Sequence, residues 1–231
     1  MKLASAVSGV AVAALALSFG LAGCGSGAKS NQASTTTTTT TTTKAQAKVA
    51  PRIENAPGPN PTIATYIQDN GITETPVHRG DPGAPTINLP TADGWVDAGQ
   101  DTPDWAYSAI VFNGPEAQDY TPSIVALVSK LTGNVDQQKI LQLAPGELNN
   151  LPGFKPMSDG SASTLGNFPA YQLGGTWVQD GQTKLVAQKT VVIPGSDGVY
   201  VLQLNADGLE DQLDTVAAAT TTIDDQTTIT P

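Results

Sequence analysis

The sequence predicts an α+β fold in which a central antiparallel sheet is covered by helices. Three consecutive stretches, 170–179, 185–193 and 199–205, carry apolar residues at alternate positions, and turns containing glycine separate them. Such alternation is typical of strands with one apolar face. Apolar residues at helical spacing before and after these stretches predict the helices that cover the sheet.

The first elements of the domain are short. Thr62 is a suitable N-cap for a helix in which Ile63, Tyr66 and Ile67 recur at helical spacing, and Gly71 ends it. Residues 86–89 form a brief predicted strand. Trp95 begins the next strand, directly after an Asp-Gly turn.

Two longer strands follow, at 106–113 and 123–131, with a loop at 114–122 between them. Their apolar runs are almost continuous, which indicates that both faces of these strands are covered.

The middle of the domain is predicted to be helical. Asn134 is the expected cap of a helix that meets Pro145, where we expect either a kink or the start of a second helix. Residues 161–165 then form a strand that leads into the three described first.

The C-terminal part is predicted to end in a helix capped by Asp207, with Glu210 at its third position and an apolar stripe that continues to Ile223. The polar tail 224–231 either pairs as an edge strand or trails.

The register of the first two long strands depends on the turn between them. Placing Tyr171, Leu173 and Trp177 on the face of the odd-numbered apolar residues of the next strand requires a loop with an odd number of residues. The simplest is a three-residue loop with Gly181 in the left-handed region. Gly174-Gly175 within the strand indicates a bulge or a close backbone approach to a covering helix or a ligand.

The N-terminal residues predict export and lipidation. Residues 1–23 combine Lys2, a short apolar run and small residues, the pattern of a signal peptide. The stretch Leu21-Ala22-Gly23-Cys24 matches the bacterial lipobox, so Cys24 is expected to carry acyl chains such as palmitate. Several acyl chains hold a protein stably in a membrane, which predicts attachment to the cell membrane on its outer, periplasmic side.

Residues 24–59 are predicted to be a tether, and residues 60–231 the globular domain. The tether has no apolar periodicity and includes nine consecutive threonines, Thr35–Thr43. The threonines are either glycosylated or an unmodified spacer. Cys24 is the only cysteine in the chain, so the domain has no disulfide to stabilise it.

The predicted tether and the predicted globular domain differ in net charge. Residues 25–59 have four Lys and Arg and one Glu, a net charge of +3, whereas residues 60–231 have six Lys and Arg against twenty Asp and Glu, a net charge of −14. A strongly acidic domain disfavours nucleic acid as a partner. The basic tether suits anionic headgroups.

The sequence contains no motif for a reaction. His78 is the only histidine, it lies among prolines, and no Gly-x-Ser-x-Gly elbow is present. The chain has no pair of His or Cys residues, so the sequence predicts no metal site. It predicts no cofactor either. The acidic residues from Asp207 to Asp214 fit the first turns of a helix better than a calcium face.

Four aromatic residues near predicted loops are candidates for ligand binding: Trp95, Trp105, Tyr107 and Trp177. Amphipathic aromatic side chains at the mouth of a cleft suit a sugar, or an acyl chain with a polar head. The same residues are also typical core plugs and turn anchors.

Several stretches of residues 60–231 resemble the mycobacterial LpqN/LpqT lipoprotein family. They are Thr62–Ile67, Thr75–Gly83, Leu143–Leu148, Ala187–Pro194 and Asp225–Pro231. The resemblance implies an α/β sandwich similar to the Mog1p/PsbP-like fold. It also implies a non-enzymatic lipoprotein associated with the mycolic-acid envelope and with MmpL-type lipid exporters.

Two readings of function follow from these observations. In the first, the protein binds an acylated envelope component such as a trehalose glycolipid, or acts as an accessory to its MmpL-type exporter. In the second, it is an acidic interaction module that binds an envelope or host protein. A hydrolase would be a third class, for which the sequence offers no residues.

Overall fold

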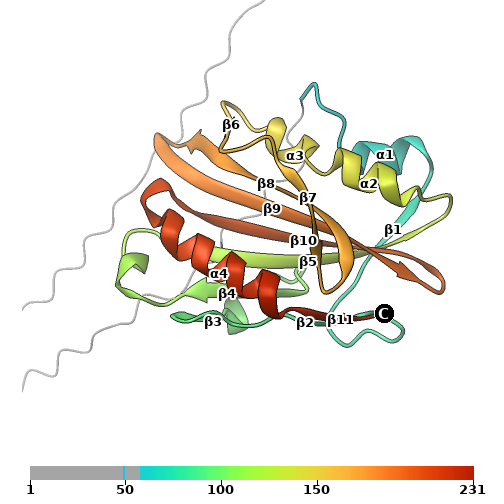
Figure 1. The fold of residues 1–231 in the computed structure, drawn as a ribbon, viewed down its shortest axis with the longest axis horizontal. Helices are drawn as coiled ribbons and strands as arrows, with labels where there is room; N and C mark the ends of the chain where they lie inside the picture. The colour runs from blue at the N-terminus through green and yellow to red at the C-terminus, as the bar shows by residue number, and fades with distance from the viewer. Residues whose placement is uncertain (1–48, 50–57) are drawn as a thin grey trace, which may run out of the picture. The chain divides into compact units, whose positions relative to one another are not determined.

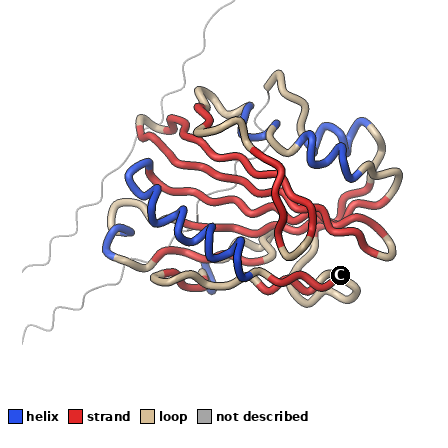
Figure 2. Tube along the Cα trace, in the orientation of Figure 1, coloured by secondary structure: helices blue, strands red, loops and turns tan. Residues whose placement is uncertain are grey.

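A computed structural model describes residue 49 and residues 58–231 of the chain. The predicted signal peptide, Cys24 and the threonine tract lie outside the described residues. The described residues belong to one compact unit. Two sheets and four helices make up its described part (Figures 1 and 2).

The described helices are α1 (Ile63–Asp69), α2 (Gln137–Leu143), α3 (Gly146–Asn149) and α4 (Leu213–Gln226), with 3-10 turns at Gly99–Asp101, Pro115–Ala117 and Glu210–Gln212. The strands are β1 (Thr73–Pro76), β2 (Thr86–Asn88), β3 (Trp95–Asp97), β4 (Ser108–Phe112), β5 (Ser123–Thr132), β6 (Lys155–Pro156), β7 (Ser161–Leu165), β8 (Phe168–Gln179), β9 (Gln182–Gly195), β10 (Gly198–Leu209) and β11 (Thr228–Thr230).

The main sheet is antiparallel and has the strand order β3-β4-β5-β10-β9-β8-β6, with β1 also paired to β5 and β7 to β8. A second, two-stranded sheet pairs β11 with β2. The predicted α+β architecture is confirmed. The long hairpins β8-β9-β10 and their neighbour β5 form its centre (Figure 1).

Helices cover both faces of the main sheet. On one face Val216, Ala219 and Ile223 of α4 pack on strand residues that include Val191 and Leu202. On the other face lie α1 and α2, packed against strand residues such as Val192 and Val201. Leu148 of α3 packs with Leu173 and Trp177 of β8 on that same face. Successive strand residues point to opposite faces, and both sets are therefore buried.

The predicted register between β8 and β9 is wrong by one residue. The strands are joined by a two-residue turn, Asp180-Gly181, in which both residues have positive φ, 52° and 78°. This is the geometry of a tight hairpin turn whose twist matches that of the strands. Trp177 therefore pairs with Lys184. The expectation of a single apolar face is wrong for the same reason, because Leu173 and Trp177 point away from Leu185 and Val191.

Two predicted helix caps are also wrong. Asp136, not Asn134, caps α2, and its Oδ1 accepts hydrogen bonds from the backbone N–H of Gln138 and Lys139 at 2.9 and 3.1 Å. Asp207 caps no helix, because β10 continues past it to Leu209 and a 3-10 turn precedes α4.

Other local predictions are confirmed. The hydroxyl of Thr62 accepts from the backbone N–H of Thr65 at 3.2 Å and caps α1. A second helix, α3, follows Pro145 directly, and residues 228–230 of the tail pair as a strand. Strand β5 is buried on both faces along most of its length.

Candidate functional site

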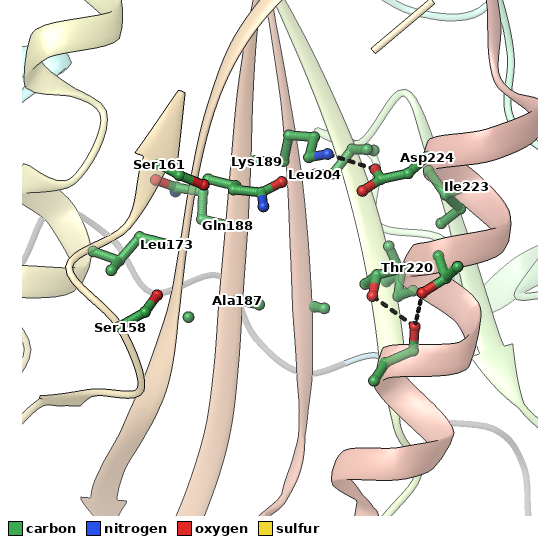
Figure 3. A pocket seen from close by; sticks show the side chains of 16 residues that line it. Ser158, Ser161, Leu173, Ala187, Gln188, Lys189, Leu204, Thr220, Ile223 and Asp224 are labelled. Atoms are coloured by element: carbon green, nitrogen blue, oxygen red, sulfur yellow. Dashed lines mark hydrogen bonds and ion pairs between the residues drawn. The ribbon is translucent and has the colours of Figure 1, made fainter. Parts of the chain in front are cut away.

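The main candidate site is a cavity of about 350 Å³ between α4 and the sheet, here called the α4 pocket (Figure 3). Strands β5, β8, β9 and β10 form its floor, and α4 forms one wall with Ala217, Thr220 and Thr221. Ser158, which precedes β7, and Ser161, which begins it, lie on the opposite side from α4 (Figure 3).

The floor of the α4 pocket consists of small residues in a single row across three strands. Gly174 of β8 pairs with Ala187 of β9, and Ala187 pairs with Ala206 of β10. Ile124 of β5 continues the row. A Cβ on Gly174 would lie 3.3 Å from the Cβ of Ala187. The space beneath α4 exists because no side chain in the first three positions is long enough to fill it.

An ion pair lies at one end of the α4 pocket. The Nζ of Lys189 lies 2.6 Å from the Oδ1 of Asp224 of α4 (Figure 3). The Lys189 side chain is 10% exposed and that of Asp224 37%. Gln172 and Ser161, which pair with each other across β7 and β8, add polar groups beside it. The pocket thus joins an apolar floor to a polar end whose two charges neutralise each other.

A smaller cavity of about 90 Å³ adjoins the α4 pocket. The two share Ile124, Leu204 and Ile223 in their linings, and the smaller one leads to Arg79 and Asp97. The apolar lining therefore extends under the C-terminal end of α4.

The opposite face of the sheet has a second large cavity, of about 340 Å³, here called the α1 pocket. It is lined by α1, β1, β5 and β10, together with Glu147 of α3 and Trp105. Two of its lining residues, Glu74 and Glu147, carry charge.

The structure does not bring the four aromatic candidates together. Trp95 is 5% exposed and its ring centroid lies 5.8 Å from that of Phe112 in the core. Tyr107 is 6% exposed, and Trp177, 8% exposed, packs under α3. Trp105 alone among the four lines one of the two large cavities, the α1 pocket, and none of them lines the α4 pocket. Their role in ligand binding stays a prediction.

His78 lies on the surface of the domain. Its Nδ1 is 3.7 Å from the Oδ2 of Asp81, and its Nε2 is 3.1 Å from the carbonyl oxygen of Asp104. Among the described residues, no group of three or more His, Cys, Asp and Glu is placed to hold a metal ion.

Three polar residues that the sequence did not mark as a unit meet where β9 begins and β10 ends. The hydroxyl of Tyr120 donates a hydrogen bond to the Oδ1 of Asp207, and the Nζ of Lys184 lies 3.3 Å from the centroid of the Tyr120 ring. Burial raises the pKa of Asp207, although Tyr120 and Lys184 act against this shift. Burial lowers the pKa of Lys184, and burial with the nearby Asp207 raises that of Tyr120.

This cluster joins the loop before β5 to the sheet. Gln212 adds to it, because its Nε2 donates to the carbonyl oxygens of Glu116 and Tyr120 at 2.7 and 2.8 Å. The contacts hold the loop in place, and neither large cavity includes these residues.

Sequence reasoning also missed the ion pair in the α4 pocket. Lys189 is one of two lysines in the apolar strand β9, and its partner lies 35 positions away in α4. A lysine in a buried strand is the signal that could have pointed to a paired charge.

Comparison with known proteins places the chain in a family. The family model described as "Probable lipoprotein LpqN" matches residues 59–230. The chain belongs to the LpqN lipoprotein family. The lipoprotein LpqN of Mycobacterium tuberculosis H37Rv is 56% identical over 178 residues, which cover 76% of this chain and 77% of that protein.

One solved structure supports the LpqN assignment. The crystal structure of LpqN of M. tuberculosis, a protein involved in cell envelope biogenesis, matches with a TM-score of 0.72, 56% identity, and coverage of 75% of this chain and 100% of that chain. Mog1p of Saccharomyces cerevisiae matches with a TM-score of 0.37, 13% identity, and coverage of 67% and 90%. The fold assignment of this LpqN-family chain rests on its own topology and on the first of these structures.

No helix in the described part of this LpqN-family chain is both long and apolar enough to cross a membrane.

Proposed function

We propose that this protein is a lipid-anchored lipoprotein of the mycobacterial cell envelope that holds an acylated envelope component in its α4 pocket. A trehalose glycolipid is the ligand class that fits best. The protein catalyses no reaction on this ligand. It binds the ligand at the membrane or supplies it to an MmpL-type exporter.

The α4 pocket is the observation that carries this proposal. Its volume of about 350 Å³ lies in the range of small-molecule sites. Gly174, Ala187 and Ala206 leave space above an apolar floor, which suits part of an acyl chain. The pocket therefore fits a ligand with an apolar chain better than a wholly polar one.

The polar end of the pocket favours a neutral head group. Lys189 and Asp224 already neutralise each other, so an anionic or cationic head would have to break their ion pair. Sugar hydroxyls both donate and accept hydrogen bonds, and can bind to the side chains of Gln172 and Ser161 without displacing either charge.

Membership of the LpqN family supports the envelope location, because LpqN of M. tuberculosis is involved in cell envelope biogenesis. The lipobox at Cys24 supports an anchor in the cell membrane. Replacing Cys24 with Ala should release the protein from the membrane fraction.

A binding assay tests the ligand. The full chain in detergent micelles is titrated into a trehalose monoester that carries a fluorescent acyl chain, and anisotropy is recorded with unlabelled trehalose mycolate as competitor. Ala187→Leu, which fills the floor, should weaken binding at least tenfold. Ala162→Leu, on the exposed outer strand β7, should leave it unchanged. Equal binding by all three proteins, or no saturable binding, would overturn the proposal.

The acidic interaction module remains the second candidate. The net charge of −14 over residues 60–231 favours a basic protein partner. Crosslinking in cells at two salt concentrations separates the candidates, because capture through charge weakens with salt whereas burial of an acyl chain does not.

A serine-reactive probe tests the third class, a hydrolase. We expect the probe not to label the protein.

A further inference from the structure

The α1 pocket has the features of a second binding site. Its volume of about 340 Å³ is close to that of the α4 pocket, and it opens on the opposite face of the sheet. Its walls come from five elements and the loop that carries Trp105, so the site depends on the assembled fold and on no single local motif.

The charges in the α1 pocket are both negative. Glu74 reaches it from β1 and Glu147 from α3, and its lining residues include no Lys, Arg or His. Neither carboxylate takes part in an ion pair among the described residues.

Neutral donors bind one oxygen of each carboxylate. Ser129 Oγ donates to Glu74 Oε1 at 2.6 Å. Gln188 and Gln203 donate through their Nε2 atoms to Glu147 Oε2 at 2.9 and 3.5 Å. The other oxygen of each carboxylate accepts no hydrogen bond from the residues that the structure describes. These contacts hold both side chains in place and leave their charge uncompensated, which attracts a cation.

The remaining lining is apolar and includes an aromatic ring. It includes Ile63 and Ile67 of α1, Leu127 and Val201 of the sheet, and Trp105. Aliphatic walls suit a short methylene stem, and an indole ring attracts a cation placed over its face.

We propose that the α1 pocket binds an alkylammonium or alkylguanidinium group. The group is either a small free cation or the end of a Lys or Arg side chain of a protein. Its stem packs against α1 and Trp105, and its charged end lies between Glu74 and Glu147. The site is independent of the α4 pocket, so this inference does not rest on the proposed function.

Calorimetry on the full chain in detergent micelles tests the site. The probe is n-butylguanidinium, and n-butylurea is its neutral isostere. We expect saturable binding of the guanidinium and none of the urea at the same concentrations. Equal heats from the two compounds would overturn the proposal, because they would show that charge is not recognised.

Substitutions assign the binding to these two carboxylates. Glu147→Gln keeps the shape and should weaken binding about tenfold, and the more exposed Glu74→Gln about threefold. Trp105→Leu should weaken it about threefold. Glu210→Gln, an exposed acid outside the pocket, makes the same change in net charge and should have no effect. If Glu74→Gln and Glu210→Gln changed the affinity equally, the proposed site would be contradicted. This comparison does not require Glu147→Gln to fold.

A second titration distinguishes a free cation from the side chain of a protein. N-acetylarginine methylamide presents the same guanidinium on a piece of peptide backbone. Affinity within threefold of n-butylguanidinium assigns the site to a protein side chain. A loss of more than tenfold assigns it to a free cation, since the backbone does not then fit at the entrance.

Discussion

Lys189 in the middle of β9 and Asp224 near the end of α4 are joined by an ion pair of 2.6 Å across the end of the α4 pocket. The lysine is the more buried of the two, with 10% of its side chain exposed against 37% for the aspartate. The two residues therefore differ in what each loses when its partner is removed.

Asp224→Asn should destabilise the protein more than Lys189→Met does. The first change leaves a buried ammonium without a counter-charge, which costs about 3 kcal/mol in the free energy of unfolding. The second leaves an aspartate that water can reach and should cost about 1 kcal/mol. Urea unfolding followed by circular dichroism measures both. The surface pair Lys130–Asp197 is the control, and Lys130→Met should destabilise the protein less than Lys189→Met does.

The sequence predicted the elements of this fold better than their register. Local signals in the sequence are Thr62, Pro145 and the alternation in β8, β9 and β10. Each predicts its own element, because a cap, a helix start or a strand depends on neighbouring residues. The register of β8 against β9 depends instead on the number of residues in one turn. That number cannot be read from apolar alternation alone.

The register also determines which glycine lines the candidate site. With the predicted odd-numbered loop, Gly174 would lie on the opposite face from Ala187, and Gly175 would lie on the same face. In the observed register Gly174, Ala187 and Ala206 are cross-strand neighbours. The pocket floor is formed by small residues on three strands. Which residues form it can be determined only once the pairing of these strands is known.

The turn itself gives a prediction. Gly181 has a φ of 78°, where a branched side chain is strained, so Gly181→Val should lower the free energy of unfolding by about 1–2 kcal/mol. Asp180→Asn should be neutral or slightly stabilising, since Asn-Gly is favoured in a turn of this type. Urea unfolding of both variants measures the effects, and equal stability of wild type and Gly181→Val would contradict the two-residue turn.

Asp207 shows how tertiary structure can override a local signal. Its spacing to Glu210 resembles a capping box. However, β10 remains paired with β9 as far as Leu209, and Gln212 supplies the cap by accepting from the backbone N–H of Leu209 at 2.9 Å. The carboxylate of Asp207 is consequently buried against Tyr120.

Burial of Asp207 makes stability depend on pH. Its pKa is raised in the folded state, so its favourable contribution is complete below the ordinary Asp value of about 3.9 and is lost as the pH rises through the raised value. The stability of wild type relative to Asp207→Asn should therefore fall as the pH rises above about 4. Urea unfolding at several pH values measures this difference.

Tyr120→Phe provides the matched control for the pH prediction. The Tyr120 hydroxyl lowers the pKa of Asp207 by donating a hydrogen bond to it, so the variant should lose stability at a higher pH than wild type does. A pH midpoint that stays constant or moves downward would show that this hydrogen bond does not hold the carboxylate in its charged form.

The start of α1 packs against the start of α3 so closely that Gly146 cannot carry a side chain. A Cβ there would lie 2.2 Å from the carbonyl oxygen of Pro61 and 3.0 Å from its carbonyl carbon. Gly146→Ala should therefore lower the free energy of unfolding by about 2 kcal/mol, because backbone must move to relieve the overlap. Asn149→Ala, at an exposed position of the same helix, should change it by less than about 0.5 kcal/mol. Thermal and urea unfolding measure both variants. If the two were equally stable, the close contact that positions α1 and Glu147 around the α1 pocket would not exist.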